Sequence, residues 1–159
     1  GYDLKPREEM EGIVEYFSKE ELLRQSDVVS LHVDLNPTSE GLLTKAEFDQ
    51  MKPGASLVNA SRGPVVNTAD LINALKDGPL AFAALDTVEG EGPIFNADHR
   101  QDGLKGEPLV EELHAMDNVI LTPHIAFFTN IAVQNMVDIS LDDVITILNG
   151  QPSEHEVAN

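Results

Sequence analysis

Short apolar runs alternate with segments of helical spacing along most of this chain. The runs cover residues 28–33, 55–58, 80–85 and 119–121 and are rich in leucine, valine, isoleucine or alanine. The segments between them place apolar residues three and four positions apart, as a helix with one buried face does. This alternation is typical of βαβ units and predicts an α/β fold with a doubly wound parallel sheet. The run at 28–33 is expected to be a strand covered on both faces.

Capping and stop signals set the expected ends of the helices. Ser18 followed by Glu21 has the spacing of a capping box, in which each side chain pairs with an amide that the first turn leaves open. Thr44 is expected to start a helix that reaches about Met51. Residues 87–118 show no long periodic stretch and are expected to form a long connection, either functional or a flexible surface excursion. The other expected features are a turn at 36–38, a helix starting at Asn67 or Thr68 with an apolar stripe of Leu71, Ile72 and Leu75, a short helix over 108–116, a long helix over 128–148 with a wide apolar face, and a loose tail over 153–159.

Composition narrows the possible functions. Ten basic against 28 acidic residues give a formal net charge of −18, which argues against a nucleic-acid surface and against anchoring to anionic lipid. The chain has no cysteine, so it has no disulfide framework or thiolate metal site, and no metal site is expected. No apolar run approaches the length of a membrane span and the N-terminus lacks the features of a signal peptide. We therefore expect a soluble, cytoplasmic protein.

Three side chains with catalytic chemistry each follow the end of a separate predicted strand. Arg62 follows the run at 55–58, Glu91 follows 80–85, and His124 follows 119–121. The carboxyl ends of parallel strands form one edge of a sheet, where open α/β folds place their ligands. A guanidinium, a carboxylate and an imidazole that meet there are the groups needed to hold and protonate a 2-oxo acid.

The motifs around these side chains resemble those of the D-isomer-specific 2-hydroxyacid dehydrogenases. The segments are Asn-Ala-Ser-Arg-Gly at 59–63, Leu-Asp-Thr-Val-Glu-Gly-Glu at 85–91 and Thr-Pro-His-Ile-Ala at 122–126. Residues 88–91, the long connection and the pair Phe127 and Phe128 are most similar to the D-lactate dehydrogenase branch. The resemblance implies a Rossmann-like fold and an NAD-dependent oxidoreductase. Phe127 and Phe128 would either cover a small apolar substrate group or pack against the core.

The resemblance also implies catalytic roles. Arg62 would clamp the substrate carboxylate and polarise the neighbouring carbonyl, a task suited to its fixed fork of donors. His124 would donate the proton to the carbonyl oxygen. A glutamate would accept a hydrogen bond from His124 and orient its ring. Composition does not separate Glu89 from Glu91 for this role, but the family spacing, five residues beyond Asp86, selects Glu91.

Further positions are implied to bind the cofactor NAD. Asp34 stands where the family usually has proline after His-Val, which changes the backbone and the charge beside the expected phosphates. Tyr2 and Asp3 resemble the end of the second strand of a dinucleotide fold, where a carboxylate binds the ribose hydroxyls and favours NAD over NADP. The full implied set is Asp3, His32, Val33, Asp34, Ser39, Ala60, Ser61, Arg62 and Asp86.

The glycine-rich phosphate turn that should precede Asp3 is absent. The expectation is a C-terminal fragment in which residues 1–150 are an incomplete NAD-binding domain, the C-terminal part of a dinucleotide-binding domain, and 151–159 are a tail. The phosphate loop and the substrate domain would lie outside it, and the fragment alone would have little activity.

The leading hypothesis is reduction of a small 2-oxo acid, pyruvate first, to its D-2-hydroxy acid by a protein that, by resemblance, is a homodimer. Related enzymes acting on phosphoglycerate, glyoxylate or branched 2-oxo acids are alternatives. Formate oxidation is disfavoured because that branch typically has glutamine at the position of Glu91. A corepressor-like protein that senses NAD is an alternative from another class, since such proteins resemble the enzymes at all three catalytic positions.

Overall fold

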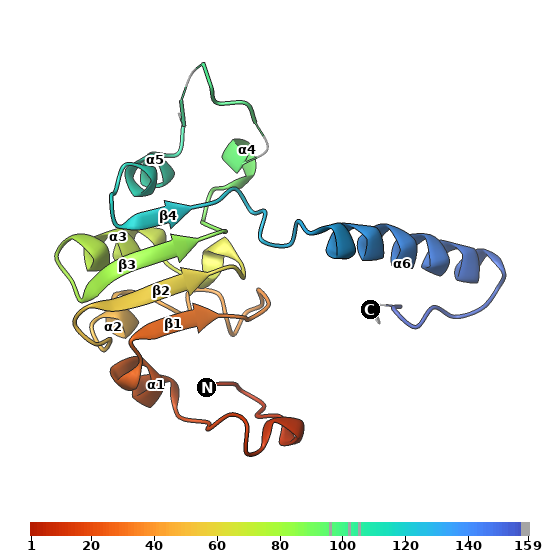
Figure 1. Cartoon of the computed structure of the whole chain (residues 1–159), viewed down its shortest axis with the longest axis horizontal. Coiled ribbons are helices and arrows are strands. Elements are labelled where there is room, and N and C mark those ends of the chain that lie inside the picture. Colours follow the sequence, from red (N-terminus) through yellow and green to blue (C-terminus); the bar gives the residue numbers. More distant parts are fainter. Residues whose placement is uncertain (96, 102, 105, 157–159) are drawn as a thin grey trace. The chain divides into compact units, whose positions relative to one another are not determined.

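Four parallel strands form one sheet in the order of the chain. The computed structural model describes residues 1–95, 97–101, 103–104 and 106–156. The strands are β1 (Val28–Leu31), β2 (Ala55–Asn59), β3 (Leu80–Leu85) and β4 (Val119–Leu121), paired as β1-β2-β3-β4 (Figure 1). The α/β class with a parallel, Rossmann-like sheet is confirmed.

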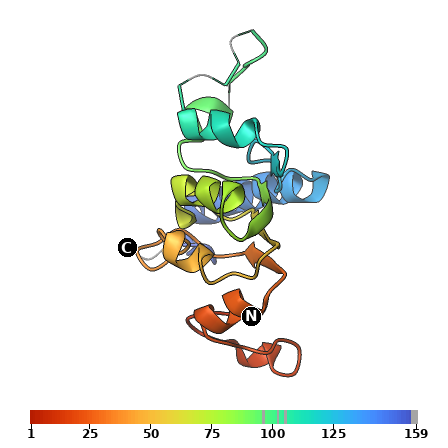
Figure 2. The same ribbon diagram turned by 90° about the vertical axis from the view of Figure 1, so that its left-hand side faces the viewer.

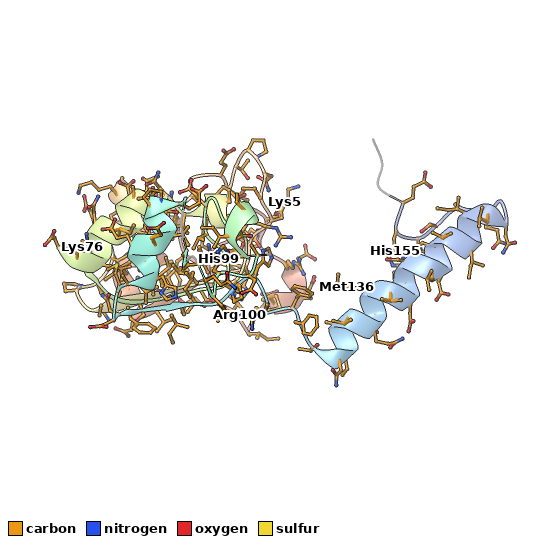
Figure 3. The ribbon with its side chains drawn as sticks, turned by 90° about the horizontal axis from the view of Figure 1, so that it is seen from above. Lys5, Lys76, His99, Arg100, Met136 and His155 are labelled. Atoms are coloured by element: carbon orange, nitrogen blue, oxygen red, sulfur yellow. The ribbon has the colours of Figure 1, made fainter. Side chains whose placement is uncertain are left out.

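Helices on one face of the sheet connect these strands. They are α2 (Lys45–Phe48), α3 (Thr68–Lys76) and α5 (Pro108–His114), and each contacts the next in this order. Helix α1 (Lys19–Gln25) precedes β1 and contacts α2. Figure 2 shows α2, α3 and α5 one above another, and Figure 3 shows α3 and α5 on the same side of the strands. Right-handed crossovers that always advance in one direction place every connecting helix on the same side. This arrangement is one half of a doubly wound sheet.

The prediction that the run at 28–33 is covered on both faces was wrong. The strand ends at Leu31, and buried Val29 and Leu31 alternate with exposed Val28 and Ser30. Within residues 1–124 the face opposite the helices stays open along β1. The apolar composition of the run predicted burial of both faces of β1. The direction of the crossover connections decides instead whether helices cover one face of the sheet or both.

Packing of α3 against the sheet forms the centre of the core. The expected stripe of Leu71, Ile72 and Leu75 is buried, and Leu57 and Ala83 of the neighbouring strands are fully buried. Asn67 caps the helix by accepting a hydrogen bond from the amide of Asp70. Burying each large apolar side chain stabilises the fold by about 1.5–3 kcal/mol. The packing of α3 against the strands therefore holds in place the sheet whose strand ends carry the candidate site.

Two capping boxes define the shorter helices. Ser18 and Glu21 form the predicted box at the start of α1, and Thr44 and Glu47 form a second one at the start of α2. The helix after Thr44 ends at Phe48 and is followed by a turn, so it is shorter than predicted. The turn at 36–38 is present.

The long connection contains more regular structure than its composition indicated. The short helix α4 (Gly92–Phe95) was not predicted, whereas the predicted helix over 108–116 is present as α5 and ends at His114. Single 3-10 turns occupy Glu8–Met10 and Gly63–Val65.

The chain divides into two compact units, residues 1–124 and 125–159. In the second unit, the predicted long helix is present as α6 (Asn130–Leu148). The side chain of Thr129 caps it by accepting a hydrogen bond from the amide of Ala132. None of the residues of α6 is buried. Ser153 and His155 return to bond Asp143 on this helix, and residues 157–159 of the expected tail lie outside the described residues. Within the described part of the chain, no helix combines the length and the apolar character that crossing a membrane requires.

Candidate active site

The ends of β2, β3 and β4 are aligned at one edge of the sheet. Asn59, Leu85 and Leu121 are neighbours in the strand register. Arg62 and His124 each follow three residues after these positions, and Glu91 follows six residues after Leu85. The loops that carry the three candidate catalytic side chains therefore start from a common line.

Glu91 and His124 are in direct contact. Nδ1 of His124 lies 2.6 Å from Oε1 of Glu91, and the two side chains are 37% and 21% exposed, respectively. The second carboxylate oxygen of Glu91, Oε2, accepts a hydrogen bond of 2.8 Å from the amide of Val88. Because both oxygens of the carboxylate are engaged, the carboxylate is fixed in orientation and holds the imidazole ring in turn.

The backbone of His124 is locked to the end of β3. Its amide donates to the carbonyl oxygens of Asp86 and Thr122 at 2.9 and 3.0 Å, and its φ of 52° lies in the left-handed region. The buried carboxylate of Asp86 accepts a hydrogen bond of 2.5 Å from the hydroxyl of Thr122. These hydrogen bonds therefore join the ends of β3 and β4 next to the imidazole ring of His124.

Glu89, the rival of Glu91, serves a different element. Its Oε2 accepts a hydrogen bond of 2.7 Å from the amide of Thr68, the first residue of α3. A carboxylate is favourable there because the first amides of a helix are unpaired and carry partial positive charge. The structure therefore separates the two glutamates that composition left equivalent.

Arg62 is an exposed residue on a tightly held loop. Its Nη1 donates to the carbonyl of Ser61 at 2.7 Å, and Ser61 donates its hydroxyl to the carbonyl of Val33, beyond β1. A Cβ added to Gly63 would lie 2.2 Å from the backbone carbonyl of Val88. Only glycine permits this approach, so the loop after β2 contacts the loops after β1 and β3.

The predicted cofactor positions after β1 form a compact turn. The Ser39 hydroxyl donates to the carbonyl of Asp34 at 2.5 Å and is buried. The carboxylate of Asp34 accepts a hydrogen bond from the side-chain Nδ2 of Asn36 at 3.0 Å. Nε2 of His32 lies 2.8 Å from the hydroxyl of Ser30.

Asp3 is not brought to the other candidates by any described interaction. Its carboxylate accepts a hydrogen bond of 2.8 Å from the amide of Lys5, and residues 1–3 form no strand. Ala60, in contrast, lies exposed directly after the inner strand β2, next to Ser61 and Arg62.

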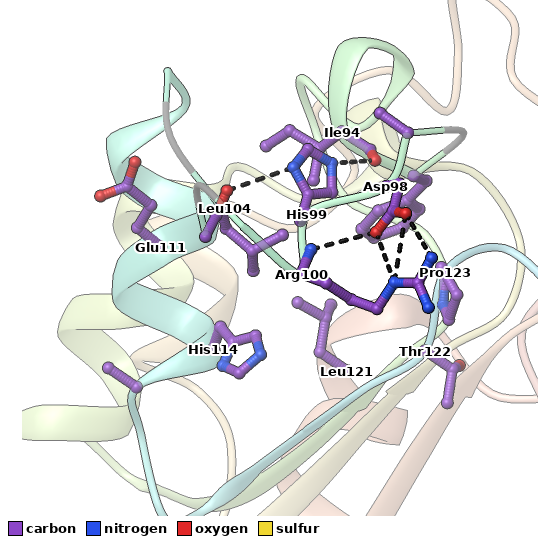
Figure 4. A pocket seen from close by; sticks show the side chains of 14 residues that line it. Ile94, Asp98, His99, Arg100, Leu104, Glu111, His114, Leu121, Thr122 and Pro123 are labelled. Atoms are coloured by element: carbon purple, nitrogen blue, oxygen red, sulfur yellow. Dashed lines mark hydrogen bonds and ion pairs between the residues drawn. The ribbon is translucent and has the colours of Figure 1, made fainter.

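A cavity of about 880 Å³ lies beside this edge, between α4, α5 and the end of β4 (Figure 4). Thr122 and Pro123 line it, but Arg62, Glu91 and His124 do not. Among its lining residues, Arg100 pairs with Asp98, and both ring nitrogens of His99 face carbonyl oxygens. This cavity is therefore not the one expected around the three catalytic candidates.

Sequence reasoning did not single out Asn59. It is a buried polar residue at the end of β2 whose side chain bonds only to backbone groups. The signal available in the sequence was an amide side chain at the end of an apolar run, directly before the segment that carries Arg62.

Comparison with known proteins identifies the family that this chain resembles. Residues 1–126 match the model of the D-isomer specific 2-hydroxyacid dehydrogenase, NAD binding domain. A D-lactate dehydrogenase of Staphylococcus aureus is 40% identical over 153 residues, which are 96% of this chain and 46% of that protein. A D-lactate dehydrogenase of Treponema pallidum is 39% identical over 157 residues, 99% of this chain and 47% of that protein.

Solved structures agree with these relatives. A D-lactate dehydrogenase from Sporolactobacillus matches with a TM-score of 0.92 at 47% identity. The match spans 99% of this chain and 47% of the Sporolactobacillus chain. A D-lactate dehydrogenase from Lactobacillus jensenii, solved with NAD+, has a TM-score of 0.91 at 38% identity, with coverage of 99% and 47%. The chain spans about half the length of the curated relatives it matches.

Proposed function

Because the chain belongs to the D-isomer-specific 2-hydroxyacid dehydrogenase family and matches its NAD-binding domain, we propose that the whole protein interconverts a small 2-oxo acid, pyruvate first, and its D-2-hydroxy acid. The single observation that carries the proposal is the Glu91–His124 contact of 2.6 Å at the carboxyl edge of the sheet. NAD is the cofactor of the domain that the family model describes. The proposed division assigns residues 1–150 to this domain and 151–159 to a tail.

The residues at the sheet edge fit a dinucleotide. Ala60 is small and exposed just after the inner strand β2, and the flat nicotinamide ring is proposed to lie beside it. Asp86 offers its carboxylate from the next strand end, while Val33, Asp34 and Ser39 form the turn on the adenosine side. NADH, when bound, supplies the hydride for C2 of the oxo acid.

In the proposed reaction, Arg62 clamps the substrate carboxylate and polarises its carbonyl group. The protonated ring of His124 gives its proton to the carbonyl oxygen as the hydride reaches C2, so that the 2-hydroxy acid forms and the imidazole is left neutral. Glu91 holds the ring in line through Nδ1 and balances its positive charge. Asp3 disfavours a 2′-phosphate and so selects NAD over NADP. By family resemblance, the whole protein is proposed to act as a cytoplasmic homodimer.

Kinetics of the full-length protein test this function. Wild-type protein is expected to oxidise NADH with pyruvate and to release the D-isomer of lactate, and a panel of phosphohydroxypyruvate, glyoxylate and branched 2-oxo acids ranks the substrates. Arg62→Ala should raise KM and lower kcat, and His124→Ala should mainly lower kcat, by about 100-fold or more.

Matched controls are available on exposed positions outside the site. Arg24→Ala on α1 and His114→Ala on α5 remove the same side chains and should leave kcat/KM unchanged. Kinetics like those of the wild type for Arg62→Ala or His124→Ala would overturn the assigned roles. Binding of NAD that changes oligomeric state, without turnover of any 2-oxo acid, would indicate a sensor in place of an enzyme.

A further inference from the structure

The side chain of Asn59 makes three hydrogen bonds, all to backbone groups. Its Nδ2 donates to the carbonyl oxygen of Arg62 at 3.1 Å and to that of Thr87 at 3.4 Å. Its Oδ1 accepts a hydrogen bond from the amide of Ser61 at 3.1 Å. The side chain is 1% exposed, so water does not compete for these bonds.

These bonds join the two loops that carry the catalytic candidates. We call residues 60–63 the arginine loop and residues 86–91 the glutamate loop. The backbone adds a second connection, since the carbonyl of Asn59 accepts a hydrogen bond from the amide of Asp86 at 2.8 Å. The close approach of Gly63 to the carbonyl of Val88 is a third.

We propose that Asn59 is a positioning residue that holds the arginine loop in register with the glutamate loop, so that Arg62 and the Glu91–His124 pair act on the same substrate molecule. The inference rests on the proposed function, because it assigns a purpose to the register between these loops. Asn59 itself touches only backbone.

The chemistry of the amide explains why asparagine suits this position. Two carbonyl oxygens and one amide hydrogen face the side chain, so it must offer two donors and one acceptor on a short stem. An aspartate of nearly the same shape would turn an oxygen towards the two carbonyls and lose both bonds. A buried carbonyl left without a donor carries its full desolvation cost, and the loops would separate to reach water.

A loose register is expected to affect binding and turnover together. The substrate is held by Arg62 on one loop and protonated by His124, which Glu91 orients from the other. Displacements of about 1 Å between such groups cost up to about 100-fold in rate. A purely structural asparagine would instead lower stability and leave the kinetics of the folded fraction unchanged.

The full-length protein offers a matched control for this test. Asn118, before β4 at the other end of the strands, also donates its Nδ2 to two backbone carbonyls, those of Leu75 and Ala81 at 3.4 and 3.2 Å. Asn59→Asp and Asn118→Asp therefore make the same chemical change at opposite ends of the sheet. Asn59→Ser is the second variant, since it replaces the two amide donors with one hydroxyl on a shorter stem and buries no charge.

Two measurements are compared at equal folded fraction. Asn59→Asp and Asn59→Ser should lower kcat/KM for pyruvate by about tenfold or more, with KM raised and kcat lowered, whereas Asn118→Asp should stay within about twofold of the wild type. In hydrogen–deuterium exchange, both Asn59 variants should lose protection in the arginine loop and the glutamate loop together, which the Asn118 variant should not.

The two readouts distinguish the possible failures. If neither loop gains exchange in the Asn59 variants, or if their kcat/KM stays within about twofold of the wild type, the positioning role is wrong. If the wild type turns over no 2-oxo acid, the proposed function is wrong, and the exchange of the two loops still decides whether Asn59 holds them together.

Discussion

At the scale of single residues, Glu89 and Glu91 show that two identical side chains in one loop can bind different parts of the protein. Both carboxylates accept a backbone amide, Glu91 from Val88 and Glu89 from Thr68. Glu91 alone of the two has its second oxygen on a ring nitrogen of His124. Glu89, two positions before Glu91, therefore bonds to the start of helix α3 and not to an imidazole ring.

Replacing each glutamate with glutamine, which removes its charge, tests the two roles separately. In the full-length protein, Glu91→Gln should lower kcat/KM for pyruvate by about 10- to 100-fold, because the ring loses the carboxylate that holds it in line. Glu89→Gln should leave kcat/KM unchanged and cost about 0.5–1 kcal/mol of unfolding free energy, the contribution of a negative charge at a helix start. Steady-state kinetics and chemical denaturation check both; equal kinetic losses in the two variants would contradict the assignment.

At the scale of elements, the start of α2 depends on an ionised side chain. Burial would raise the pKa of Glu47, but hydrogen bonds from Thr44 and Lys19 outweigh it and lower that pKa from 4.5 to about 2. A carboxyl group whose pKa is lowered by folding stabilises the protein above the pKa of the unfolded chain. This contribution is lost as the pH falls from 4.5 towards about 2.

Glu47→Gln should therefore show a pH-dependent loss of stability. We expect a loss of about 1–2 kcal/mol of unfolding free energy near pH 7. The full pKa shift would give a larger value, but solvent screens the partly exposed pair of Glu47 and Lys19. The difference from the wild type should shrink as the pH falls below about 4. Denaturation measured across this pH range checks it, with Asp49→Asn as control, since Asp49 pairs with Lys45 on the exposed side of the same helix. A loss independent of pH would contradict the ionic origin.

Local patterns predicted the elements that are governed by local physics. The apolar runs gave β3 and β4 their observed bounds, and the Ser18–Glu21 spacing gave the start of α1. The short helix α4 was missed because its four residues include glycine and proline, which composition reads as a turn.

Contacts between distant segments were predicted only in part. The spacing of a known family selected Glu91 as the partner of His124, and the contact is present, although its role in catalysis stays a prediction. Two other contacts were not predicted: the bond from Glu89 to the start of α3 and the bonds from Asn59 to two loops. Both depend on which strands pair, and no local pattern encodes strand pairing. Coverage of only one face of β1 depends on crossover direction for the same reason.

At the scale of the whole molecule, a strong negative charge coexists with a large exposed apolar surface. The formal net charge is −18. The exposed large apolar residues of α6 are Ile131, Met136, Val137, Ile139, Leu141, Val144, Ile145, Ile147 and Leu148. Contiguous apolar surface drives association, and net charge opposes it over a distance that salt shortens.

The 159-residue chain should therefore self-associate as salt is raised. Light scattering should detect monomers at about 0.02 M salt and larger species at about 0.5 M, where the charges are screened. Replacing Leu141 and Ile145 with glutamine keeps the charge and removes apolar surface, so this variant should stay monomeric in both conditions. Association of the variant at high salt would show that another surface is responsible.

The separation between the two ends of the strands has a practical consequence. Arg62, Glu91 and His124 all follow carboxyl ends, whereas the exposed turn of Pro53 and Gly54 precedes the amino end of β2. Exposed turns tolerate inserted segments. A fluorescent label or an immobilisation tag placed at this turn would report on the protein, or tether it to a support, without crossing the edge where cofactor and substrate are proposed to enter.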